Sequence, residues 1–142
     1  ARMKAADEFG KGLAVRQQMF YAAVSLELHT RDPKGLDTTR VVAELQARYS
    51  PFPIVPGTYL ETSFTHLDGY SATYYTYMWS LVIAKDMFTV FSRGDLLDAS
   101  AAARYRKAVL EPGGSKPAAE LVSDFLGRPY NFDAYEAWLN AN

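Results

Sequence analysis

Hydrophobic residues recur every three or four positions between residues 11 and 30, which is the period of a helix with one buried face. Residues 32–35, Asp-Pro-Lys-Gly, then break this pattern, because proline and glycine together end a helix and turn the chain. A second helix is predicted to end at Tyr49, and either Asp37 or Thr38 can cap its N-terminus. This part of the chain therefore predicts two helices joined by a short turn.

Prolines interrupt the helical pattern in the middle of the chain. Three of them fall within residues 50–57, which forbids a continuous helix and predicts an extended, ordered loop. Residues 58–66 have a β-like composition, but an isolated strand is marginal, so we expect the loop to continue. Further helices are predicted over residues 71–92, 101–110 and 118–125 (capped by Gly127), and over a last segment that Asn131 or Asp133 caps and that ends near Trp138. The sequence thus predicts an all-α, multi-helical single domain, residues 1–142, with one long Pro-rich ordered loop.

Composition narrows the classes of protein to consider. With 15 Lys and Arg against 16 Asp and Glu, the chain lacks the basic footprint of a nucleic-acid binder. The absence of cysteine excludes disulfides and thiol nucleophiles, and it is compatible with the cytoplasmic location that we expect. Residues 69–84 are the longest charge-free stretch, shorter than the ~20 residues of a spanning helix, so no membrane partner is expected. The chain starts without Met, in the middle of an amphipathic segment and without a signal peptide, so we expect a fragment of a longer protein.

Tyrosines concentrate in that charge-free stretch. On the predicted helix, Tyr70, Tyr74 and Tyr77 lie at i, i+4 and i+7 and share one face. Two interpretations stay open. Such a stripe is usually core, with each hydroxyl bonded to a backbone carbonyl, and the pattern alone favours this interpretation. It also suits a substrate cleft, because neutral hydroxyl donors can bind a peptide carbonyl or a developing oxyanion.

A histidine, an aspartate and a glycine directly precede the tyrosines. His66 is either a loop histidine bonded to the backbone, or a donor or proton-transfer partner at the same carbonyl group. Asp68 is near enough in sequence to orient His66, or it faces solvent, and Gly69 belongs to the same loop. His66 is a poor metal ligand, because the other histidine, His29, is distant in sequence and no HExxH motif is present. We interpret His29 as structural and predict no metal ligand in this chain.

Several short motifs occur in an order that carries a family resemblance. The most specific is the run Gly-Tyr-Ser-Ala-Thr-Tyr-Tyr-Thr-Tyr-Met-Trp at residues 69–79. The others lie at residues 16–20 with Ala23 and Ser25, at 56–59 and 63–67, at 105–106 with 109–110, and at 112–115, 125–128 and 133–134. On these motifs, nearly the whole chain resembles the C-terminal part of the thimet-oligopeptidase-type zinc metallopeptidases, which include oligopeptidase A and the bacterial peptidyl-dipeptidases.

The resemblance implies a mostly helical, clamshell-shaped enzyme with a deep channel that admits only short peptides. It implies zinc held by two histidines of an HExxH helix and by a glutamate of a following helix, all outside this chain, so the chain alone should be inactive. The matching family residues contact the substrate backbone and stabilise the tetrahedral intermediate. We therefore expect catalytic roles for Tyr77, Tyr70 and His66, and substrate binding by Tyr74, Gly69 and Asp68.

Two hypotheses for function follow. The leading one is the substrate-binding C-terminal segment of a zinc-dependent oligopeptidase that hydrolyses short peptides. Its expected partners are short peptide substrates and the N-terminal part of the same enzyme, and the isolated chain should self-associate through the exposed cleft face. The alternative is a stand-alone, non-catalytic helical module that binds peptides, and such a module should be a monomer.

Overall fold

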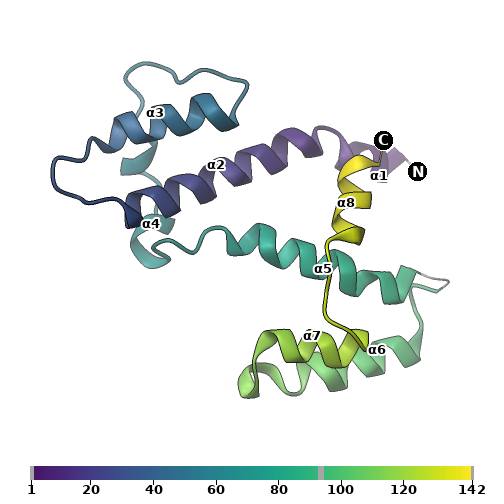
Figure 1. Cartoon of the computed structure of the whole chain (residues 1–142). Coiled ribbons are helices and arrows are strands. Elements are labelled where there is room, and N and C mark those ends of the chain that lie inside the picture. Colours follow the sequence, from purple (N-terminus) through teal and green to yellow (C-terminus); the bar gives the residue numbers. More distant parts are fainter. Residues whose placement is uncertain (1, 93–94, 142) are drawn as a thin grey trace. The chain divides into compact units, whose positions relative to one another are not determined.

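The computed structural model describes residues 2–92 and 95–141, without the side chains of residues 4, 5, 7 and 92. Within these ranges the chain is helical and contains no strand, which confirms the all-α class (Figure 1). The helices are α1 (Arg2–Glu8), α2 (Lys11–Thr30), α3 (Thr38–Tyr49), α4 (His66–Gly69), α5 (Thr76–Ser92), α6 (Ala99–Tyr105), α7 (Ala118–Leu126) and α8 (Asp133–Asn140). Three short helical turns accompany them, η1 (Leu60–Thr62), η2 (Arg106–Leu110) and η3 (Gly113–Ser115). No helix of the described ranges is long and apolar enough to cross a membrane.

The chain divides into two compact units, Ala1–Met78 and Trp79–Asn142. The first unit contains α1 to α4 and the first residues of α5, and the second contains the rest of α5 and α6 to α8. The assignment of residues 1–142 to a single domain stays a prediction.

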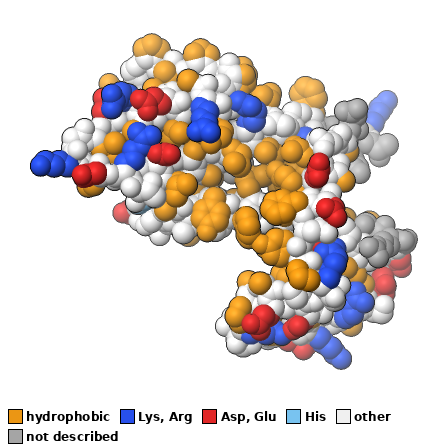
Figure 2. All heavy atoms as spheres, viewed as in Figure 1, with side chains coloured by type: hydrophobic (Ala, Val, Ile, Leu, Met, Phe, Trp, Pro, Cys, Tyr) orange, Lys and Arg blue, Asp and Glu red, His pale blue; other side chains and the backbone are white. Residues whose placement is uncertain are grey.

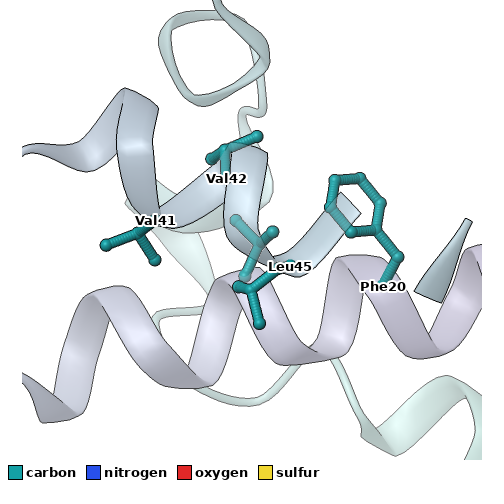
Figure 3. Close-up of a cluster of buried hydrophobic side chains, with 5 residues drawn as sticks. Phe20, Val41, Val42 and Leu45 are labelled. Carbon is teal, nitrogen blue, oxygen red and sulfur yellow. The ribbon is translucent and has the colours of Figure 1, made fainter. Parts of the chain in front are cut away.

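α2 and α3 begin and end where the sequence predicts, and they form the core of the first unit. Asp37 caps α3, because its side chain accepts a hydrogen bond from the backbone N–H of Arg40 at 2.9 Å. Figure 3 shows the labelled side chains on these two neighbouring helices, with Phe20 on α2 and the other three on α3. The buried cluster consists of Phe20, Val24, Val41, Val42 and Leu45. Burial of each such side chain contributes about 1.5–3 kcal/mol to the free energy of folding. On the face drawn in Figure 2, charged side chains of both signs lie over the same helices.

Aromatic rings join three helices of the second unit. Phe125 of α7 has its ring centroid 6.0 Å from that of Phe91 in α5 and 5.4 Å from that of Tyr105 in α6. Leu121 and Val122 are buried on the same α7 face, so the apolar side of this helix forms the local core. Gly127 ends α7 with a φ of 73°, a left-handed conformation that glycine adopts without strain, as predicted.

The structure differs from the prediction in two segments, residues 101–110 and residues 58–66. The helix predicted over residues 101–110 begins at Ala99, because the Asp98 carboxylate accepts hydrogen bonds from the backbone N–H groups of the first turn. The last five residues of this predicted helix form the π-helical turn η2. Residues 50–59 contain no helix or strand. Residues 58–66, predicted to continue this loop, contain the turn η1, and α4 begins at the last of them, His66.

The helix predicted over residues 71–92 begins only at Thr76. Ser71 has a φ of 47°, and a helix does not continue through this left-handed conformation. The hydroxyl of Thr73 donates to the carbonyl of Tyr70 at 2.6 Å, which is a local alternative to helical hydrogen bonding. The tyrosines before Thr76 therefore lie outside α5, and the prediction that three tyrosines share one helical face is wrong.

Candidate functional site

Three tyrosines gather around one histidine although they lie on different elements. His66 begins α4, Tyr70 follows its last residue, Tyr74 lies in the turn before α5, and Tyr77 lies in the first turn of α5. The ring centroid of His66 is 5.8 Å from that of Tyr70, 5.0 Å from that of Tyr74 and 5.9 Å from that of Tyr77. A turn, rather than a helical face, therefore brings these side chains together. We call these four residues the tyrosine–histidine cluster.

His66 and Tyr77 are joined by a hydrogen bond. The Nε2 atom of His66 lies 3.2 Å from the hydroxyl oxygen of Tyr77. If Nδ1 carries the ring proton, the Tyr77 hydroxyl donates to Nε2. If Nε2 carries it, the ring donates to the Tyr77 oxygen, and the hydroxyl hydrogen is free to bind a ligand. Tyr77 is 54% exposed and Tyr70 is 63% exposed, so both side chains are accessible on the first unit.

Tyr74 is the buried member of the cluster. It is 8% exposed, and its hydroxyl donates to Oε1 of Gln18 in α2 at 3.2 Å. Burial raises the pKa of Tyr74 above its usual value, which keeps the hydroxyl neutral, although the bond to Gln18 acts in the opposite direction. Its ring also packs against that of Phe64, with centroids 5.2 Å apart. The hydroxyl of Tyr74 is thus already engaged, unlike that of Tyr70.

The two remaining predicted residues lie at the rim. Asp68 and Gly69 are both exposed at the end of α4. No hydrogen bond between Asp68 and His66 occurs among the described contacts. The His66 ring is instead bonded to Tyr77, so Asp68 does not orient it in this structure. A Cβ atom at Gly69 would meet no atom within 4 Å, so this position is open to a ligand.

Two residues of α2 form side-chain hydrogen bonds to this region, and the sequence pointed to them only as parts of a motif. Gln18 accepts from Tyr74, and Ser25 donates through Oγ to the carbonyl oxygen of Ser71 at 2.6 Å. Ser25 is fully buried. A polar side chain on the buried stripe of a predicted helix requires a hydrogen-bond partner, and this signal could have identified both residues.

The predictions from the sequence did not include a buried carboxylate in the second unit. Asp86 of α5 is 1% exposed, and its two oxygens accept from Arg128 at 2.6 Å and 2.8 Å. The backbone N–H of Asn131 donates to the same carboxylate at 2.9 Å. The hydrogen bonds from Arg128 hold the pKa of Asp86 below its usual range, although burial alone would raise it. The signal was a carboxylate within an apolar helix, which predicts a cationic partner.

The described residues do not fit a zinc site. No group of three or more His, Asp or Glu side chains among them is suited to hold a metal ion. His29 is in the last turn of α2, where its Nδ1 lies 2.8 Å from the carbonyl oxygen of Ser25.

Comparisons with known proteins identify one family. The family model described as peptidase family M3 matches residues 1–141, which confirms the resemblance drawn from the motifs. Mitochondrial intermediate peptidase of Schizophyllum commune is 35% identical over 117 residues, covering 82% of this chain and 14% of the relative. The protein of the same name from Coprinopsis cinerea is 38% identical over 118 residues, covering 82% of this chain and 14% of the relative. The one from Rattus norvegicus is 31% identical over 118 residues, covering 83% of this chain and 17% of the relative. The chain thus spans about one sixth of the length of these relatives.

These relatives overturn the predicted location. All three are named as mitochondrial proteins, so the cytoplasmic prediction is wrong. That prediction depended on the lack of cysteine, and cysteine content reports on redox conditions rather than on a particular reducing compartment.

Proposed function

Because the chain belongs to peptidase family M3, we propose that it is a substrate-binding segment of a longer zinc-dependent oligopeptidase. The small fraction of each relative that it spans supports this proposal. The zinc ligands of such an enzyme would lie outside this chain. The chain alone would then be inactive, and residues 1–142 would form one part of a larger catalytic region.

The hydrogen bond between His66 and the exposed Tyr77 is the observation that carries the proposal. With the proton on Nε2, His66 donates to the Tyr77 oxygen and makes the Tyr77 hydroxyl a stronger donor. That hydroxyl then binds the oxyanion as charge develops on the scissile carbonyl of the peptide. Tyr70 supplies a second accessible hydroxyl beside His66, for the same oxygen or for a neighbouring peptide carbonyl.

The other predicted residues extend the contact surface. Asp68 and Gly69 lie beside His66 at the exposed rim, where a peptide backbone can approach. The Tyr74 hydroxyl is bonded to Gln18 and the residue is 8% exposed, so a peptide would reach only the small part of its side chain that is left at the surface. The partners proposed for the chain are therefore short peptides and the remainder of the same enzyme. By analogy with the relatives, we propose that the enzyme acts in mitochondria.

Tyr77→Phe in the longer peptidase tests the proposal. Loss of one oxyanion donor should lower kcat by about 10²–10³, because the donor acts mainly in the transition state. The measurement is steady-state hydrolysis of a short, internally quenched fluorogenic peptide. Tyr49→Phe is the matched control, because Tyr49 packs against the core of the first unit and lies outside the cluster.

An unchanged kcat in Tyr77→Phe would exclude the oxyanion role. Three results together would instead support the non-catalytic binding module. The 142-residue chain would be a monomer, it would bind peptides with the same affinity in a metal-free buffer, and its gene would encode no HExxH upstream.

A further inference from the structure

One face of α2 lies under the tyrosine–histidine cluster. Gln18, Tyr21 and Ser25 follow one another at intervals of three and four residues, so their side chains point in the same direction from the helix. Each contacts the segment that carries the cluster, although that segment is far away in sequence. The contacts lie entirely within the first unit.

Ser25 holds the start of the segment between Tyr70 and α5. Its Oγ donates to the Ser71 carbonyl oxygen at 2.6 Å, and Ser25 has 0% exposure. Ser71 has the only positive φ of a non-glycine residue among the described residues. Side chains with a Cβ avoid this conformation unless the surroundings impose it. The bond from Ser25 fixes the carbonyl of this residue and so helps to direct the chain out of α4 and toward Tyr74.

Gln18 holds the end of the same segment. Its side-chain oxygen accepts from the Tyr74 hydroxyl, and the Tyr74 ring lies 5.0 Å from both the His66 ring and the Tyr77 ring, measured between centroids. Tyr21 supports Tyr74 from the same side, with ring centroids 5.7 Å apart. Tyr74 therefore lies between α2 and the His66–Tyr77 pair, and a shift of Tyr74 would move that pair.

We propose that Gln18 and Ser25 are positioning residues of the peptidase site. They attach the two ends of the turn at residues 71–74 to α2, and this attachment sets the distance between His66 and Tyr77. Neither residue contacts the substrate, and both act through the turn and through Tyr74. The inference rests on the function proposed for Tyr77.

The test compares two substitutions at Gln18 in the longer peptidase. Gln18→Met removes the acceptor but keeps a side chain of similar length, whereas Gln18→Glu keeps an acceptor for the Tyr74 hydroxyl. We expect Gln18→Met to lower kcat about 10- to 100-fold with little change in KM, because a displacement of the catalytic group weakens the transition state more than the bound substrate. Gln18→Glu should retain most of kcat. The same change one residue earlier, Gln17→Met, is the matched control and should leave kcat unchanged.

Two further variants extend the test. Ser25→Ala removes the hydroxyl, and alanine fits the buried helical position, so kcat should fall while the enzyme stays folded. Adding Tyr74→Phe to Gln18→Met should cost less than the sum of the two single changes, because both remove the same hydrogen bond. Thermal unfolding of each variant, measured in parallel, separates a displaced site from a destabilised protein.

The outcomes distinguish this inference from the proposed function. If Tyr77→Phe lowers kcat but Gln18→Met and Ser25→Ala do not, the positioning role is overturned and the proposed function stands. Equal losses in Gln18→Met and Gln18→Glu, or losses that follow the unfolding temperature alone, would also overturn the positioning role. If Tyr77→Phe leaves kcat unchanged, the proposed function fails, and the inference fails with it.

Discussion

The two units each hold polar side chains among hydrophobic ones, but they use them differently. In the second unit, Asp86 is almost completely buried and its carboxylate receives three hydrogen bonds, two of them from Arg128. In the first unit, Tyr77 is about half exposed and its hydroxyl shares one hydrogen bond, with His66, among the described contacts. The carboxylate of Asp86 is thus closed to solvent and ligands, whereas the side chain of Tyr77 is open to them.

This difference separates structural polar groups from a candidate site. A buried carboxylate that is bonded to its own protein through both oxygens is out of reach of a ligand, and its removal acts on stability. Exposed hydroxyls with donor capacity to spare can bind a ligand without the loss of an internal bond. The altered pKa of Asp86 is therefore a sign of a structural ion pair here, although such shifts are also found at catalytic sites.

Arg128→Met should have the largest effect on stability, because it leaves a buried carboxylate without its cation. We expect the second unit to lose about 3 kcal/mol. Both tryptophans, Trp79 and Trp138, belong to this unit, so urea unfolding of the 142-residue chain followed by tryptophan fluorescence measures it selectively. Arg106→Met is the control, because the ion pair of Arg106 with Glu111 is exposed and should contribute little. Equal losses in both variants would contradict the closed character of the Asp86 network.

The pH dependence of the same variant should be smaller but diagnostic. In the wild type, the pKa of Asp86 is lowered on folding, so its contribution to stability is present above the unfolded pKa and is lost as the pH falls through the folded value. The deficit of Arg128→Met relative to the wild type should therefore be greatest at neutral pH and should narrow between about pH 5 and pH 3. Urea unfolding at several pH values measures this. A deficit that does not vary with pH would mean that Asp86 carries no charge-dependent role.

Tyr77→Phe should have the smallest effect on stability, although it has a large expected effect on kcat. Its hydroxyl is exposed and can bond to water, so we expect the free energy of unfolding of the first unit to change by less than about 0.5 kcal/mol. Hydrogen exchange of the amides in α2 and α3 reports this unit, which contains no tryptophan. A loss as large as that of Arg128→Met would show that the cluster is a structural core rather than an open site.

Much of the fold was predictable because its causes are local. The α2 and α3 boundaries follow from hydrophobic periodicity, from the cap at Asp37 and from a proline–glycine break, all within a few residues of the helix ends. The end of α7 at Gly127 is of the same kind. The candidate site residues were singled out through the motif run and the family resemblance, and their roles stay predictions. The shared helical face assigned to the three tyrosines does not exist, because α5 begins only at Thr76.

The sequence by itself determined the all-α class, the bounds of α2 and α3 in the first unit and, through the order of its motifs, the family. Only the tertiary structure decided that the chain turns at Ser71 instead of continuing as a helix, that Tyr74 is buried against Gln18, and that Asp86 pairs with Arg128. The hydrogen bonds concerned join residues 46, 56 and 42 positions apart. Periodicity and capping act over a few residues, so they contain no information about which distant side chain will satisfy a buried polar group.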